Sequence, residues 1–92
     1  MAQPGLKCVV AWSERRYLCS VVEEGLRALA GVDEVRRLSD DACLVYTDLE
    51  AVNVRDQLRD RLEPGESLLV VEFEKWSGYG AVDSAWLLRR GH

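Results

Sequence analysis

Carboxylates are the most numerous side chains in this sequence that could do chemistry, and two pairs of them are closely spaced. Glu72 and Glu74 stand two residues apart in an apolar stretch typical of a strand, so their side chains share one face. Asp40 and Asp41 are adjacent in a polar segment suited to a turn. Either pair could give oxygen ligands to Mg²⁺, but neither has a third ligand beside it in the sequence. We therefore predict no bound metal, with Glu72 and Glu74 as the candidate ligands if one binds.

Nucleophilic catalysis has little support in the sequence. The single histidine is His92, the last residue given, so we predict no Ser-His-Asp arrangement. Cys8, Cys19 and Cys43 lie in unrelated contexts, and none belongs to the C-x-x-C pairs that mark zinc and redox sites. Free cysteine is among the most buried residue types. We interpret all three as reduced, buried, small apolar residues, and we predict no catalytic residue.

The composition is that of one globular domain. The chain has 92 residues, of which 48% are hydrophobic and 30% are charged. A net charge of −4 gives no general attraction to phosphate backbones, so contact with nucleic acid would need a local basic patch. No run approaches the ~20 apolar residues of a membrane-spanning helix, and the first residues lack the pattern of a secretory signal. We expect a cytoplasmic protein without a membrane partner.

Four short apolar segments, rich in β-branched residues, are the candidate strands. They cover residues 6–12, 33–38, 42–46 and 67–76. The second and third are separated only by Ser39, Asp40 and Asp41, which suit a tight turn. These two segments are therefore predicted to form a β-hairpin.

Two stripes of apolar residues at helical spacing lie between the strands. Ser13 is placed to cap the first helix, and Gly31 to end it. Thr47 and Glu50 have the capping-box spacing at the start of the second helix. The two stripes comprise Leu18, Val22, Leu26 and Leu29, then Ala51, Val54, Leu58 and Leu62. Residues 81–90 form a final element whose type the pattern does not decide.

The order of these elements is β-α-β-β-α-β, which predicts an α+β protein with the ferredoxin-like fold. Both helices should cover one face of a four-stranded antiparallel sheet. We expect a single domain over residues 1–92, with a flexible start at 1–5 and a C-terminal loop and tail at 76–92.

The strands raise a further expectation because they are apolar on both faces, whereas the helices shield only one. An identical sheet related by a two-fold axis could cover the second face, so we predict a homodimer. The tail could instead fold over that face or add a strand to the partner's sheet. The candidate interface residues are Val9, Ala11, Leu44, Tyr46, Leu68, Val70, Trp76 and Trp86.

The second half of the chain resembles a known family. Residues 44–73, LVYTDLEAVNVRDQLRDRLEPGESLLVVEF, are similar to small bacterial proteins described as SinR-like. These are relatives of the small dimeric subunit of the CRISPR adaptation complex and of the virulence-associated protein D group. The shared features are a strand followed by TDL, an amphipathic helix, a motif similar to L-x-P-G-D, and an LLVVE strand. A Trp-bearing tail similar to EKWSGYGAVDSAWLL follows.

The resemblance implies a ferredoxin-like homodimer that associates through its sheets and C-terminal segments. It also implies either metal-dependent phosphodiester cleavage or an architectural role beside an integrase. The family's metal-binding residue is an Asp at the end of the first strand, and Ser13 occupies that position here. A hydroxyl does not replace a carboxylate as a Mg²⁺ ligand at comparable affinity. Arg15 and Arg16 follow, and they could contact phosphate at a helix start.

We therefore predict an architectural or nucleic-acid-associated homodimer rather than an enzyme. One alternative is a Mg²⁺- or Mn²⁺-dependent endonuclease of RNA or DNA that uses carboxylates other than the missing one. A second alternative is a regulatory or antitoxin-like module that binds a protein partner.

Overall fold

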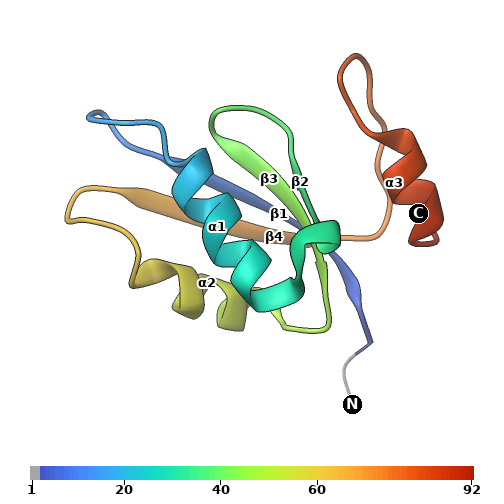
Figure 1. Ribbon diagram of the computed structural model, residues 1–92, viewed down its shortest axis with the longest axis horizontal. Helices are drawn as coiled ribbons and strands as arrows, with labels where there is room; N and C mark the ends of the chain where they lie inside the picture. Colours follow the sequence, from blue (N-terminus) through green and yellow to red (C-terminus); the bar gives the residue numbers. More distant parts are fainter. Residues whose placement is uncertain (1–2) are drawn as a thin grey trace.

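The computed structural model describes residues 3–92 and has the predicted ferredoxin-like topology (Figure 1). Four strands form one antiparallel sheet in the order β2-β3-β1-β4. The strands are β1 Gly5–Trp12, β2 Val35–Arg37, β3 Ala42–Thr47 and β4 Ser67–Phe73. The helices are α1 Cys19–Ala30, α2 Ala51–Arg59 and α3 Ser84–Arg89, and a 3-10 turn, η1 Val32–Glu34, precedes β2. Within residues 3–92, no helix combines the length and apolar character needed to cross a bilayer.

Two helices cover one face of the sheet and enclose the main core. Apolar residues of α1 and α2 pack there against alternate residues of β1, β2 and β3. The buried set is Val9, Ala11, Leu18, Cys19, Val22, Leu26, Val35, Cys43, Val45, Val54 and Leu58. The stripes predicted from the sequence are therefore the buried faces of both helices.

The two predicted helix starts are wrong. Helix α1 begins at Cys19, and Ser13 instead accepts the Arg15 N–H at 3.2 Å within the preceding loop. Thr47 ends β3 and its hydroxyl accepts the Leu49 N–H at 3.2 Å, but α2 begins only at Ala51. The first N–H of α2, at Ala51, donates to the Glu72 carboxylate at 2.7 Å. A side chain from a distant strand thus replaces the local capping box.

Other boundaries differ by a few residues. Gly31 ends α1 as predicted, with a positive φ of 101° and its N–H donated to the Arg27 carbonyl. The strand predicted over 33–38 is shortened because its first residues form η1. The strand predicted over 67–76 ends at Phe73. The first two residues of the expected flexible start lie outside the described residues, and Gly5 already belongs to β1.

The final element is a short helix that packs on the second face of the sheet. Asp83 caps α3 by accepting the Trp86 N–H at 3.0 Å. Trp86 and Leu87 are buried against Leu6 and Leu44, which point away from α1 and α2. In Figure 1, α3 lies apart from the other two helices, beyond the end of β4. The tail therefore folds over its own sheet and forms a second, smaller core.

Candidate interaction surface

The alternation of side chains along β1 and β4 assigns each residue to one face of the sheet. Val9 and Ala11 are buried under the helices, so Val10 and Trp12 point to the opposite side, here called the open face. Leu68 and Val70 also pack against the helical core. Leu69 and Val71 therefore belong to the open face.

Four of the predicted interface residues consequently lie on the wrong face for contact between sheets. They are Val9, Ala11, Leu68 and Val70, all of which pack in the helix-covered core. The sequence could not indicate this because both faces of β1 and β4 are apolar. The one charged residue of each strand, Lys7 in β1 and Glu72 in β4, lies on the helix-covered side, so charge did not mark the exposed face.

The other four predicted residues surround or contribute to the second core. Leu44 and Trp86 are buried, and Tyr46 and Trp76 pack against them while remaining partly exposed. Their partners come from the same chain. The tail therefore covers the part of the open face that these residues occupy.

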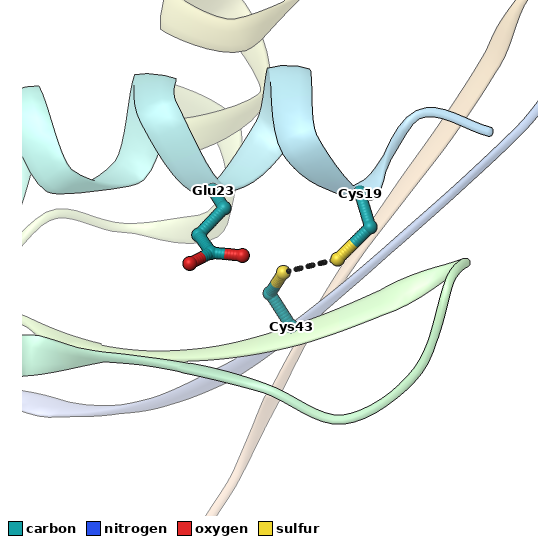
Figure 2. A group of neighbouring side chains, drawn as sticks. All are labelled: Cys19, Glu23 and Cys43. Atoms are coloured by element: carbon teal, nitrogen blue, oxygen red, sulfur yellow. Dashed lines mark hydrogen bonds between the residues drawn. The ribbon is translucent and has the colours of Figure 1, made fainter.

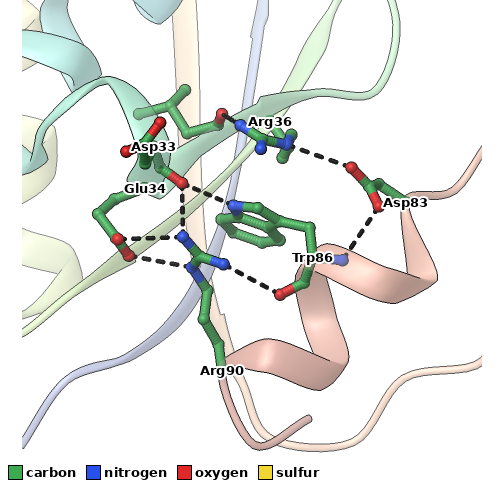
Figure 3. Close-up of polar contacts among 7 residues, drawn as sticks. Asp33, Glu34, Arg36, Asp83, Trp86 and Arg90 are labelled. Carbon is green, nitrogen blue, oxygen red and sulfur yellow. Dashed lines mark hydrogen bonds and ion pairs between the residues drawn. The ribbon is translucent and has the colours of Figure 1, made fainter.

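The tail is held in place by a polar network around Trp86 (Figure 3). The indole Nε1 donates to the Asp33 carbonyl at 2.7 Å. The Arg90 guanidinium lies 4.3 Å from the Trp86 ring centroid and pairs with Glu34 at 3.0 Å. These contacts fix α3 to the segment that links α1 to β2. The tail consequently covers the end of the open face where Leu6, Leu44 and Phe73 lie.

The remaining part of the open face is apolar and uncovered. Trp12 is 48% exposed, Leu69 is 52% exposed and Val71 is 43% exposed. They lie along two paired strands, because Val10 pairs with Leu69 and Cys8 with Val71, and Trp12 follows Val10 on the same face of β1. We call Val10, Trp12, Leu69 and Val71 the open-face patch. The sequence showed the apolar strand residues, but only the position of the tail shows which of them remain exposed.

The two arginines predicted as phosphate ligands are used within the chain. They lie in the loop before α1, not at its start. Arg15 donates to the Pro64 carbonyl at 2.9 Å. Arg16 makes two hydrogen bonds of 2.8 Å to the Glu66 carboxylate. The ion pair offsets the charge of Arg16, which weakens the case for a phosphate site.

The same ion pair predicts how stability depends on pH. Hydrogen bonds from Arg16 and from the Glu63 N–H lower the pKa of Glu66 from about 4.5 to about 2. A lowered folded-state pKa stabilises the protein fully above about pH 4.5, and this contribution is lost as the pH falls towards about 2. We expect Glu66→Gln to remove that part of the acid dependence, measured from urea unfolding midpoints across this pH range. Glu24→Gln, on an exposed part of α1, is the control and should unfold like the parent. Equal acid dependence in the parent and Glu66→Gln would contradict the prediction.

The carboxylates predicted as metal ligands do not form a complete site. Glu72 points to the helix side of the sheet and accepts the Ala51 N–H. Glu74 is exposed beyond the end of β4. Neither belongs to a group of three close metal-ligating side chains among residues 3–92. The one such group there comprises Cys19, Glu23 and Cys43, which sequence reasoning missed because the two cysteines are distant in the chain.

Comparisons of this chain with protein-family models, with curated proteins and with solved structures found no match.

Proposed function

We propose that this protein is a non-catalytic, architectural subunit that assembles as a homodimer through the open-face patch. The observation that carries the proposal is the exposure of Trp12, Leu69 and Val71 on the same face of two paired strands. A contiguous apolar patch of this kind is typical of a protein–protein contact. Two copies related by a two-fold axis would each cover the patch of the other.

The charge pattern favours a second copy as the occupant. The open-face positions of β1 and β4 carry no charged residue. They are Leu6, Cys8, Val10, Trp12, Ser67, Leu69, Val71 and Phe73. Two copies can therefore meet at this face without like charges in contact, although each has a net charge of −4. A polyanion such as nucleic acid finds no cationic partner on the same surface.

The position of Ser13 argues against metal-dependent cleavage by the mechanism that the family resemblance implies. Ser13 follows β1 directly, where the resemblance calls for an aspartate, and its hydroxyl accepts the Arg15 N–H. The resemblance to the CRISPR-adaptation subunit then supports its architectural role rather than its nuclease role. Association through sheets and tails, which that resemblance also implies, is compatible with a patch that lies beside α3.

The dimer is tested by sedimentation of the parent chain and of Val71→Lys. We expect the parent to dimerise in the micromolar range, because the patch is small for a protein interface. Lysine at Val71 would place an unpaired charge in the contact, so its dissociation constant should rise by about tenfold or more. Val32→Lys is the matched control, since Val32 is 66% exposed in η1, outside the patch. A monomeric parent, or equal weakening by both substitutions, would overturn the proposal.

The absence of catalysis is tested on the same preparation. We expect no cleavage of RNA or DNA with Mg²⁺ or Mn²⁺. Asp48 and Glu72 line one surface pocket, and cleavage that is lost in Asp48→Ala or Glu72→Ala would instead establish the endonuclease. Because Glu72 also caps α2, the folding of that variant must be checked by circular dichroism.

A further inference from the structure

Two cysteines that are far apart in the sequence meet in the helix-covered core (Figure 2). The Sγ atoms of Cys19 on α1 and Cys43 on β3 lie 3.1 Å apart, and both residues are almost fully buried. Glu23 lies one helical turn after Cys19, on the same side of α1. One ligand atom from each residue falls within 4.8 Å of the other two. Two soft ligands and one hard ligand therefore converge at one place.

We propose that Cys19, Cys43 and Glu23 form a binding site for a borderline-soft divalent cation of the Zn²⁺ class. Thiolates select such cations over Mg²⁺ and Ca²⁺, and a carboxylate oxygen is a common additional zinc ligand. Zn–S bonds of about 2.3 Å in a tetrahedral site place two sulfurs about 3.8 Å apart. The two sulfurs would therefore need to separate by only about 0.7 Å, within the reach of small side-chain rotations.

The backbone positions that carry the ligands are well fixed. Cys43 is in a strand paired on both sides, opposite Val9 of β1 and Arg37 of β2. Cys19 and Glu23 belong to the first half of α1, which packs against β3 through the main core. The ligands thus come from two elements whose relative position is set by the rest of the core.

A divalent cation bound by two thiolates and one carboxylate forms a group with net charge −1. The charges around the site suit such a group. Arg27 donates to one oxygen of Glu23, and a carboxylate has a second oxygen that remains for a metal ion. Arg37 is close enough to Cys19 for their charges to interact. Arg27 therefore offsets the excess charge of −1, while the charge of Arg37 is shared with Asp40, with which it forms an ion pair. The Glu23 side chain is 15% exposed, so a cation could enter from its side.

The protein supplies three ligands rather than four. The Ala42 carbonyl oxygen lies 3.8 Å from Cys19 Sγ, but it already accepts the N–H groups of Leu38 and Ser39. Burial and the hydrogen bond with Cys19 raise the pKa of the Cys43 thiol, which favours its protonated form when the site is empty. Binding is then an exchange, in which one divalent cation enters and the two thiols release two protons.

The site is tested by titrating the reduced, metal-free full chain with Co²⁺ under anaerobic conditions. We expect a near-ultraviolet charge-transfer band from Co²⁺–thiolate bonds, and we expect Zn²⁺ to displace the Co²⁺. Cys19→Ala and Cys43→Ala should each reduce this band strongly. Cys8→Ala is the matched control, because Cys8 lies on the open face, and it should keep the band. Glu23→Gln should keep a thiolate band but bind Co²⁺ about tenfold more weakly, or worse.

Several results would overturn the site. A parent chain with no charge-transfer band, or a band that survives in Cys43→Ala, would do so. Formation of a Cys19–Cys43 disulfide under an added disulfide oxidant, without Co²⁺ binding in the reduced chain, would identify a thiol pair instead. Glu23→Gln retains both cysteines, so weaker Co²⁺ binding by this variant cannot result from misfolding caused by the loss of a buried cysteine. In addition, Zn²⁺ should raise the unfolding temperature of the parent and of Cys8→Ala, but not of Cys43→Ala.

Discussion

Replacing Trp86 with alanine is expected to lower the free energy of unfolding by about 3 to 5 kcal/mol. Trp86 is fully buried and is the largest side chain of the second core. Its loss leaves a cavity against Leu6 and Leu44 and removes the hydrogen bond to the Asp33 carbonyl. The Arg90 guanidinium also loses the aromatic ring that it covers. Since small domains are stable by about 5 to 15 kcal/mol in total, this single change removes a large share.

The effect is measured by urea unfolding at one fixed protein concentration, so that self-association does not alter the comparison. Tyr79→Ala is the control, because Tyr79 is fully exposed in the loop before α3 and should be replaced almost without cost. If the two substitutions cost the same, Trp86 does not hold the tail in solution. The expected loss for Trp86→Ala would then be wrong.

Gly25→Val is expected to lower the free energy of unfolding by about 2 to 3 kcal/mol, because it overfills the contact between α1 and α2. A Cβ at Gly25 would lie 2.6 Å from Cδ2 of Leu58 and 3.0 Å from the Arg61 side chain. Arg61 is exposed and can move, but Leu58 is buried in the main core and has little room to do so. The helices must therefore separate, although valine is a slightly better helix former than glycine.

A matched control is available in the same helix. Ala28→Val adds a branched side chain at an exposed position of α1 and should cost well under 1 kcal/mol. Gly25→Ala should fall between the two, because the gain in helix propensity of about 1 kcal/mol offsets part of the crowding. Thermal and urea unfolding of the three variants gives the ranking. Equal stability of Gly25→Val and Ala28→Val would show that the helices adjust freely at this contact.

The fold followed from local patterns, whereas details set by distant contacts did not. Periodicity located the four strands and two main helices because each must bury a regular set of apolar residues. The start of α2 could not be predicted in the same way, because Glu72 caps it from another strand. The type of α3 was undecided because a six-residue helix is too short to show a periodic stripe.

The candidate sites were harder to predict for the same reason. The composition of β1 and β4 indicated two apolar faces, but the exposed patch depends on where α3 packs. Cys19 and Cys43 are 24 residues apart, and Arg16 and Glu66 are 50 apart. No local spacing rule connects residues at such separations. The fold brings these residues together. The predicted order of strands and helices did not specify the alignment of the elements that makes the residues neighbours.

Trp86 and Arg90 follow all four strands of the sheet in the sequence, and this order has a consequence for biosynthesis. A chain emerges from the ribosome with its N-terminal part first, so the sheet can form before these two residues are available. Until α3 has been synthesised, Leu6 and Leu44 are exposed to water and to any chaperone that binds exposed apolar surface. A premature stop codon just before α3 would leave every residue of the helix-covered core in the chain, yet the released product would expose an apolar, aggregation-prone sheet face.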